Sequence, residues 1–155
     1  MDTVRRWMSS PALVVDESMP LPDVRQRLKQ QHVRRLPVVN AAGQLVGIVT
    51  DRDMFIALGT RNTRAAHVRV GAVATTNVST CAPDDDVETA LATMKQAGVR
   101  RLPVVDAEGR LLGIVSINDI VLAAGRGKPV RNEDVVDALQ AICAPHRHDA
   151  DDAAA

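Results

Sequence analysis

The apolar residues of this chain are concentrated in short continuous runs. LPVV at 36–39 and LVGIV at 45–49 each have the length of a strand, and LPVV and LLGIV repeat the pair 66 residues later. Runs without polar alternation are typical of strands that are covered on both faces. The segments between the two runs of each pair end in Gly43 and Gly109. A glycine that takes positive φ at this place predicts a short hairpin in both pairs.

Helical spacing of apolar residues marks the segments that precede these strands. Leu21, Val24 and Leu28 recur at helical intervals. The second such segment follows the acidic run 84–86, where negative charge favours a helix N-terminus, and Gly98 then stops the helix. The apolar positions of this second helix are Val87, Ala90, Leu91, Met94 and Ala97.

The segments that follow the strands are apolar nearly all round. A helix of this kind has no polar face to turn towards water, so we expect it to contact its counterpart in the repeat or another chain. The residues concerned are Met54, Phe55, Ile56 and Leu58 after the first pair of strands, and Ile120, Val121 and Leu122 after the second.

The chain contains an internal repeat. Val33–Leu58 and Val99–Ala124 align without a gap, and 15 of the 26 aligned positions are identical. A repeat this clear predicts two copies of one supersecondary unit, here strand, helix, strand, strand, helix, related by a local two-fold axis. Any site in one copy should therefore have a counterpart in the other.

We predict five consecutive segments along the chain. Residues 1–60 form the first domain, with an extended stretch at 12–15, and 61–67 form a polar linker. Residues 68–125 form the second domain, with 68–74 starting the second copy as 4–8 start the first. A C-terminal helix is predicted within 126–143, capped by Asn132, and 144–155 are expected to be a disordered tail. The apolar face of that helix is predicted to hold Val135, Val136, Leu139 and Ile142.

Composition excludes several functions. The 155 residues include 19 basic and 19 acidic side chains, and this balance argues against duplex DNA or a membrane as a partner. One Trp, one Phe and no Tyr offer almost no stacking platform for single strands. No apolar run approaches the length of a membrane span, and the N-terminus lacks the apolar core of a signal peptide. Two cysteines do not form a disulfide framework, and Cys81 aligns with Val15 as a small core residue. We therefore expect a cytoplasmic protein.

The two LPVV…G…LxGIV[ST]xxD segments together resemble a tandem pair of CBS (cystathionine beta-synthase) domains, the arrangement called a Bateman module. The resemblance extends from about Met8 to Ala124, and Met8-Ser9-Ser10-Pro11 and the arginines of both RRLP segments also fit it. It implies an α/β (α+β) fold of two βαββα repeats packed about a pseudo-two-fold axis.

The resemblance also implies a function. Modules of this kind bind adenosine-containing ligands between the repeats, with AMP, ADP or ATP expected here ahead of S-adenosylmethionine or NAD, and with no obligatory cofactor. They transmit the change to an effector protein, which the sequence does not identify, and they form homodimers through the apolar helices described above.

The residues that end the third strand of each copy have two compatible interpretations. Thr50 with Asp53, and Ser116 with Asp119, match the capping-box pattern, which satisfies N–H groups at a helix N-terminus. The same helix N-terminus attracts phosphate, and a carboxylate fixed there can accept the ribose hydroxyls. In the family that the chain resembles, the aligned Asp holds the ribose and the aligned Thr or Ser contacts the phosphate.

Arginine pairs precede the second strand of each copy, as Arg34-Arg35 and Arg100-Arg101. The two-fold axis is expected to bring these four guanidinium groups towards one central cleft, where they would repel one another. An anion with several oxygens would relieve that repulsion through charge-assisted bonds, so we interpret these residues as phosphate clamps. Internal salt bridges to Asp or Glu are the alternative.

The base of a nucleotide would lie between aliphatic side chains and backbone. The resemblance implies main-chain hydrogen bonds to the base from Ser10-Pro11-Ala12 and Thr76-Asn77-Val78. Copy two has Ala74 and Asn77 where copy one has Met8 and Pro11, and Asn118 where copy one has Arg52. The sequence is therefore compatible with one functional site or with two.

Neither a metal site nor an active site is predicted. The spacing of the His, Cys and Asp residues near the C-terminus matches no closed tetrahedral site. Neither cysteine has the neighbouring base that a nucleophile requires, so we predict no catalytic residue and no enzymatic activity. The C-terminal residues concerned are Cys143, His146, His148, Asp149, Asp151 and Asp152.

The hypothesis from the sequence is a regulatory module that senses adenine nucleotides between its repeats and modulates a partner protein. The alternative is a ligand-free oligomerisation or docking scaffold. The scaffold predicts that Asp or Glu side chains neutralise the four arginines. An adenine-nucleotide sensor predicts that these arginines are available to an anion.

Overall fold

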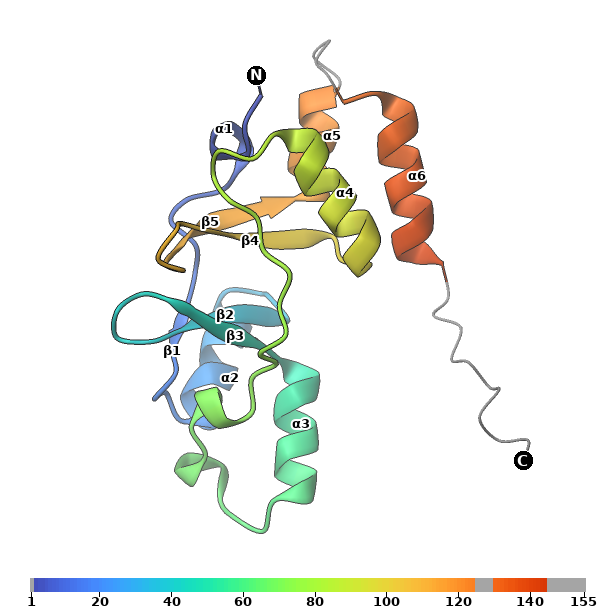
Figure 1. Cartoon of the computed structure of the whole chain (residues 1–155). Helices are drawn as coiled ribbons and strands as arrows, with labels where there is room; N and C mark the ends of the chain where they lie inside the picture. Colours follow the sequence, from blue (N-terminus) through green and yellow to red (C-terminus); the bar gives the residue numbers. More distant parts are fainter. Residues whose placement is uncertain (1, 125–129, 145–155) are drawn as a thin grey trace, which may run out of the picture.

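The computed structural model describes residues 2–124 and 130–144. It consists of two similar units, one above the other in Figure 1, each with a small sheet and helices on its outer side. We call the elements of residues 15–60 copy one and those of residues 81–124 copy two.

Copy one has the predicted order of elements. It consists of β1 (Val15–Asp16), α2 (Leu21–Gln30), β2 (Arg35–Val39), β3 (Leu45–Thr50) and α3 (Asp51–Thr60). The sheet order is β1-β2-β3, with β1 parallel to β2 and β2 antiparallel to β3. The first strand is shorter and later than predicted, because only Val15 and Asp16 pair with β2.

Copy two repeats this order except at its first strand. It consists of α4 (Val87–Ala97), β4 (Arg101–Val105), β5 (Leu111–Ser116) and α5 (Ile117–Ala124). In place of a first strand, Cys81 alone forms a parallel bridge with Val104. The chain leaves the sheet there because residues 82–85 turn, and the Asp85 carboxylate accepts the N–H of Ala82 at 2.8 Å.

The turns confirm the predicted roles of the glycines. Gly43 and Gly109, at the hairpins, have φ of +78° and +81°. Gly98 ends α4 with φ of +67°, and at the equivalent position of copy one His32 takes φ of +54°. The acidic run acts as predicted, because Asp86 caps α4 by accepting the N–H of Thr89 at 2.7 Å.

Each sheet is extended by a segment that belongs to the other copy. We call residues 8–12 opening segment one and residues 74–78 opening segment two. Ser9 of opening segment one exchanges two backbone hydrogen bonds with Ile114 of β5, at 2.8 and 3.0 Å. Thr75 of opening segment two exchanges two with Ile48 of β3, both at 2.9 Å.

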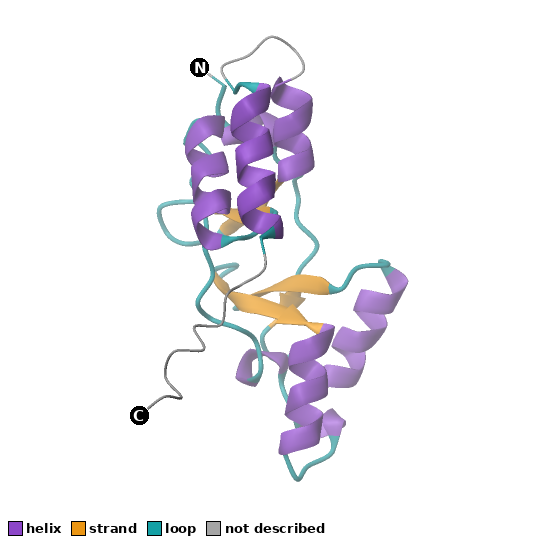
Figure 2. Cartoon of the chain, turned by 90° about the vertical axis from the view of Figure 1, so that its right-hand side faces the viewer, coloured by secondary structure: helices purple, strands orange, loops and turns teal. Residues whose placement is uncertain are grey.

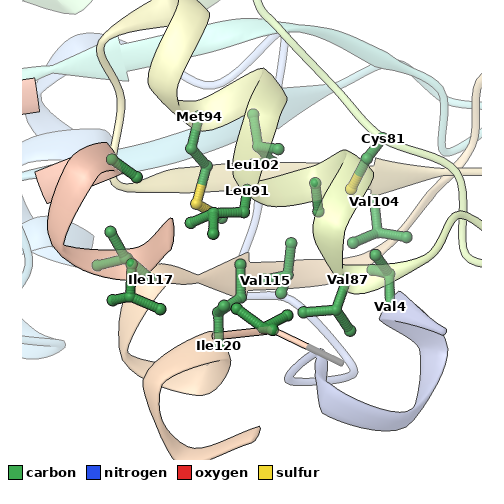
Figure 3. Close-up of a cluster of buried hydrophobic side chains, with 14 residues drawn as sticks. Val4, Cys81, Val87, Leu91, Met94, Leu102, Val104, Val115, Ile117 and Ile120 are labelled. Carbon is green, nitrogen blue, oxygen red and sulfur yellow. The ribbon is translucent and has the colours of Figure 1, made fainter. Parts of the chain in front are cut away.

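The segments that precede the opening segments are exchanged in the same way. The short helix α1 (Val4–Trp7) buries Val4 in the core of copy two, which Figure 3 shows beside Val87 and Val104. The 3-10 helices η1 (Ala65–His67) and η2 (Val70–Ala72) lie against copy one, and Val70 is buried in its core. Residues from each predicted domain thus pack in the core of the other. The domain boundaries themselves remain a prediction from the sequence.

Each copy is stabilised by its own compact hydrophobic core. Copy two shares a core of fourteen buried residues with α1, α6 and Val130, and this core includes Leu102, Val115 and Ile120 (Figure 3). β2 and β4 are buried on both faces, as the continuous apolar runs predicted, since Leu36, Pro37 and Val38 in β2 are all buried. In β3 and β5, buried residues alternate with half-buried ones, so one face of these strands is less covered than predicted.

The hairpins of the two copies meet at the pseudo-two-fold axis. Leu45 donates its N–H to the Gly109 carbonyl at 2.9 Å, and Leu111 donates to the Gly43 carbonyl at 3.0 Å. In addition, the side chain of Gln44 donates to the Glu108 carbonyl at 2.8 Å. These contacts fix the two sheets relative to each other at their turns.

The C-terminal helix α6 (Asn132–Cys143) packs beside α4 and α5 (Figure 2). Its N-cap is Arg131 rather than Asn132, because the Asp134 carboxylate reaches back to the Arg131 N–H at 3.3 Å. Val135 is buried as predicted, whereas Val136 was wrongly placed on the apolar face and is 51% exposed. The segment 125–129, and the tail from residue 145 on, lie outside the described residues.

The helices that were predicted to be apolar all round do have exposed apolar faces. On α3, Phe55, Ile56 and Leu58 are 79%, 50% and 46% exposed, and on α5, Val121 and Leu122 are 45% and 62% exposed. Within the described part of the chain, no helix is both long and apolar enough to cross a membrane.

Candidate functional site

The predicted capping box forms at the N-terminus of α3. The Thr50 hydroxyl accepts the N–H of Asp53 at 3.0 Å, and Oδ2 of Asp53 accepts the N–H of Thr50 at 3.0 Å. Both side chains are half-buried. The capping function uses one carboxylate oxygen of Asp53, so Oδ1 has no hydrogen bond within the described residues.

The same arrangement is found at the N-terminus of α5. Oδ2 of Asp119 accepts the N–H of Ser116 at 2.8 Å and the Ser116 hydroxyl at 2.9 Å, and the hydroxyl oxygen accepts the N–H of Asp119 at 3.3 Å. The repeat therefore places two fixed carboxylates at two equivalent helix N-termini.

The β-sheet register brings an arginine pair to each capping box. Arg35 lies opposite Thr50 in the β2–β3 ladder, and Arg101 lies opposite Ser116 in the β4–β5 ladder. The carbonyl of the preceding arginine accepts the first N–H of the following helix, from Asp51 to Arg34 at 3.2 Å in copy one. We call Arg34, Arg35, Thr50 and Asp53 the copy-one group, and Arg100, Arg101, Ser116 and Asp119 the copy-two group.

The four arginine side chains are exposed, and no carboxylate of the described residues neutralises them. Among residues 2–124 and 130–144, no Asp or Glu forms a salt bridge with any of them. The guanidinium groups of Arg34, Arg35 and Arg101 also form no hydrogen bond within that part of the chain, whereas Nη2 of Arg100 lies 3.2 Å from Sγ of Cys143. The salt bridges that the scaffold hypothesis predicted are therefore not found among the described residues.

Both groups lie on the same side of the molecule. The two hairpin turns are on the left of Figure 1, and β3 and β5 both run from there to the right, where α3 and α5 begin. Since the hairpins contact each other at their turns, the ends that bear the arginines face the same direction.

The opening segments lie beside the sheet of the other copy. Ser10 donates its hydroxyl to the Leu112 carbonyl at 2.8 Å. Because Ser9 pairs with Ile114 in the antiparallel sense, Pro11 and Ala12 follow β5 towards its hairpin and away from Ser116 and Asp119. Thr75 pairs with Ile48 in the antiparallel sense, so Asn77 and Val78 follow β3 towards its hairpin and away from Thr50 and Asp53. The sequence did not indicate this exchange, because no short-range pattern connects residue 9 with residue 114.

A small pocket separates opening segment two from the hairpins. It has a volume of about 160 Å3 and is lined by both copies, with Val78 and Thr76 facing Leu45, Gly47 and Gly109. A larger groove of about 370 Å3 lies between α4 and α6 and includes Lys95, Arg131 and Asp137. This groove contains none of the residues of the two groups, and its Arg131 is already paired with Asp134 at 3.3 Å.

The remaining candidate chemistry is structural. Cys81 is 5% exposed in the core of copy two, as predicted, and burial together with the nearby negative charge of Asp85 raises the pKa of its thiol to about 12. The described residues contain no cluster of three His, Cys, Asp or Glu side chains that would hold a metal ion. Of the metal-like C-terminal residues only Cys143 is described, and the others lie beyond residue 144.

Comparison with known sequences identifies the repeat. The sequence model of the family described as CBS domain matches residues 4–60 and again residues 70–126. The CBS domain-containing protein YhcV of Bacillus subtilis is 31% identical over 79% of this chain and 85% of its own length.

The lengths of other relatives differ. Inosine-5'-monophosphate dehydrogenase of Bifidobacterium longum is 34% identical over 78% of this chain, which spans only 22% of that enzyme. An uncharacterized protein of Methanopyrus kandleri is 29% identical over 64% of this chain, which spans half of it. The similarity to the dehydrogenase is thus confined to a small part of that enzyme.

Solved structures confirm the predicted fold. CBSX2 in complex with AMP has a TM-score of 0.68 and 28% identity, covering 83% of this chain and 100% of that one. The CBS domain pair of MJ0100 with 5'-methylthioadenosine and S-adenosyl-L-methionine has a TM-score of 0.66 and 27% identity, over 83% and 99%. Hypoxic Response Protein I with two coordinated zinc ions has a TM-score of 0.71 and 28% identity, over 79% and 99%.

Proposed function

The chain belongs to the CBS-domain family, and from that premise we propose that it is a regulatory module that binds adenine nucleotides of the AMP, ADP and ATP class between its two repeats. Its fold neighbours with bound AMP, or with 5'-methylthioadenosine and S-adenosyl-L-methionine, support a ligand that contains adenosine. The two groups beside α3 and α5 are the proposed binding residues.

The observation that carries the proposal is the set of four exposed arginines without a described carboxylate partner. Like charges on one side of a protein repel one another, and an anion with several oxygens removes that repulsion through short charge-assisted bonds. A nucleotide phosphate fits this requirement. Because each pair of arginines adjoins a helix N-terminus, the helix dipole adds to the attraction.

Each remaining residue has a role within this proposal. Oδ2 of Asp53 and of Asp119 accepts a backbone N–H, and Oδ1 of each is then available to a ribose hydroxyl. The hydroxyls of Thr50 and Ser116 adjoin the phosphate. Backbone groups of Pro11 and Ala12, and of Asn77 and Val78, would bind the base on the hairpin side of the two groups.

The response would arise from differential binding. A ligand shifts an equilibrium towards the arrangement that it binds more tightly, and at 100 times its Kd the shift is roughly 2.7 kcal/mol. The backbone hydrogen bonds of the opening segments and of the hairpins connect the two copies. We propose that the module works in the cytoplasm as a homodimer, with the exposed faces of α3 and α5 as the contact surface, and that it modulates an effector protein rather than catalysing a reaction.

Calorimetric titration with AMP, ADP, ATP, NAD and S-adenosylmethionine tests this function. We expect saturable binding of at least one adenine nucleotide by the native chain, and its loss in the double variant Asp53→Asn, Asp119→Asn. Asparagine retains an acceptor for the helix cap, so the fold should survive. Asp23→Asn, on the exposed first turn of α2, is the matched control. Absence of heat with all five ligands would exclude the proposed function.

The exposed apolar faces of α3 and α5 favour a second candidate, a docking scaffold without a ligand. Phe55 and Leu122 are 79% and 62% exposed, which is unusual for large apolar side chains. A scaffold would associate identically with and without nucleotide, whereas a sensor would change its association or its thermal stability when nucleotide is added.

A further inference from the structure

Helix α6 has no counterpart in copy one. It packs against α4 and α5 by burying Val135 and Ala138, with Leu139 and Ile142 half-buried against the same core. In copy one no α-helix among the described residues packs across α2 and α3, and the short 3-10 helix η1 contacts α2. The pseudo-symmetry of the pair is therefore broken on one side only.

The last turn of α6 reaches the copy-two group. Nη2 of Arg100 lies 3.2 Å from Sγ of Cys143, the final residue of the helix. The carbonyl groups of a last helical turn have a partial negative charge that favours a cation beside them. Figure 2 shows the C-terminal end of α6 directed towards the level between the two sheets. Arg100 thus contacts the Cys143 thiol at the end of α6 where the helix dipole favours a cation.

The equivalent residue of copy one has different surroundings. Arg34 is exposed, and its guanidinium forms no hydrogen bond with any residue of the described part of the chain. None of the described side chains competes with an anion for Arg34, whereas Cys143 competes with an anion for Arg100. The two groups are consequently unequal although their capping boxes match.

We propose that the end of α6 and the phosphate of the ligand compete for Arg100. The inference rests on the proposed function, because it concerns the regulation of the same site. The copy-one group then fills first, and occupation of the copy-two group frees the last turn of α6. This helix becomes the element through which a rising nucleotide concentration is converted into a structural change.

The size of the effect follows from the strength of one hydrogen bond to a charged donor. Loss of such a bond typically changes an equilibrium by about tenfold to a hundredfold, and loss of an ordinary neutral hydrogen bond by about threefold to tenfold. The thiol is a weak acceptor, so we expect the lower part of this range from Cys143 alone.

Single-site variants test the competition. Asp53→Asn leaves only the copy-two group intact, and Asp119→Asn leaves only the copy-one group. Calorimetric titration of both with AMP and with ATP should give weaker binding in Asp53→Asn. Adding Cys143→Ala should strengthen binding about threefold in Asp53→Asn and should leave it unchanged in Asp119→Asn. Cys143→Ser retains an acceptor on a shorter side chain, so its nucleotide affinity in Asp53→Asn should lie between those with Cys143 and with Cys143→Ala. Cys143 is exposed at the end of its helix, so these changes should not disturb folding.

Hydrogen exchange gives a second readout in the chain with its native cysteine. Saturating nucleotide should speed the exchange of the amides of residues 140–143 in Asp53→Asn and should not do so in Asp119→Asn. The competition would be refuted if Asp53→Asn and Asp119→Asn bound nucleotide equally well, if Cys143→Ala changed neither affinity, and if hydrogen exchange of residues 140–143 were unchanged. The proposed nucleotide sensing would not be affected by that result. Failure of every variant and of the native chain to bind either nucleotide would overturn both.

Discussion

A β-carbon on Gly113 would lie 2.5 Å from the carbonyl oxygen of Ser9. Its repeat mate Gly47 has the same relationship with opening segment two, since a β-carbon there would lie 2.7 Å from the Thr75 carbonyl oxygen. The glycine of each LxGIV run is thus required because the backbone of an opening segment passes directly over it. Conformational freedom is not the reason, since neither glycine has positive φ.

Gly113→Ala should therefore weaken the contact between the copies. The β-carbon forces backbone away from backbone, and overpacking of this kind typically costs about 1–3 kcal/mol. Urea unfolding of the variant should show that loss in the free energy of unfolding. Gly59→Ala is the matched control, because nothing lies within 4 Å of a β-carbon at this position. Equal stability of Gly113→Ala and the native chain would contradict the close contact.

His32→Gly should stabilise copy one. His32 follows the Gln31 cap of α2 with φ of +54°, in the left-handed region where Gly98 ends α4. A residue with a β-carbon is disfavoured there by roughly 1 kcal/mol, partly offset by the larger entropy of glycine in the unfolded chain. We expect a gain of about 0.5 kcal/mol in thermal or urea unfolding. The reverse exchange, Gly98→His, should give a loss, and a gain from both exchanges would refute the argument.

The free energy of unfolding should fall in alkaline solution because of Cys81. Its pKa is raised from the ordinary value of 9.0 to about 12 in the folded chain, so between these values the unfolded state loses a proton that the folded state keeps. The stabilisation is complete below pH 9 and decreases as the pH rises towards 12, by up to about 1.4 kcal/mol per pH unit.

Cys81→Val isolates this contribution, since Val15 fills the equivalent position of copy one. Unfolding by urea at pH 8, 9 and 10 should show a smaller decline for the variant than for the native chain. No tyrosine titrates in this range to confuse the comparison. Parallel declines in the two proteins would mean that the Cys81 thiol does not contribute.

Removing an arginine from the copy-one group should affect binding and not folding. The Arg35 side chain is exposed and has no described carboxylate partner, so Arg35→Gln should change the free energy of unfolding by less than about 0.5 kcal/mol. Loss of a bond to phosphate should lower nucleotide affinity about tenfold or more. Arg25→Gln, on the exposed side of α2, should change neither quantity. A clear loss of stability in Arg35→Gln would favour the scaffold.

Phe55→Lys should reduce self-association. The ring is 79% exposed on α3, next to the exposed Ile56, and a charged side chain at this place would have to be dehydrated in a dimer. Light scattering should give a dimer mass for the native chain and a monomer mass for the variant. Leu13→Lys replaces an apolar residue that is 51% exposed outside the helices and should leave the mass unchanged. A monomeric native chain would rule out α3 as a contact surface.

The local structure could be predicted from the sequence because its causes are local. Helical spacing places Leu21, Val24 and Leu28 on one buried face, and the hairpin glycines have the positive φ that their position required. The capping boxes follow from residues three positions apart. Each of these features depends on side chains that are neighbours in the chain.

The features that escaped prediction depend on contacts between distant residues. The exchange of the opening segments rests on backbone hydrogen bonds, which any residue with an N–H and a carbonyl can form, so Ser9 and Thr75 gave no signal. The bond between Arg100 and Cys143 depends on how α6 docks, and the cap at Arg131 rather than Asn132 depends on the reach of Asp134.

The exchange of residues 2–12 and 65–78 has a consequence for how such a protein can be divided. Val4 and Val70 are repeat mates, and each is fully buried in the opposite half. A fragment cut at the predicted linker would retain the strands of its own sheet. Its core would have a cavity where the valine of the other fragment packs, and one edge of its sheet would be unpaired. The two fragments should therefore bind each other and assemble when they are mixed, so the protein could be used as a split-protein reporter.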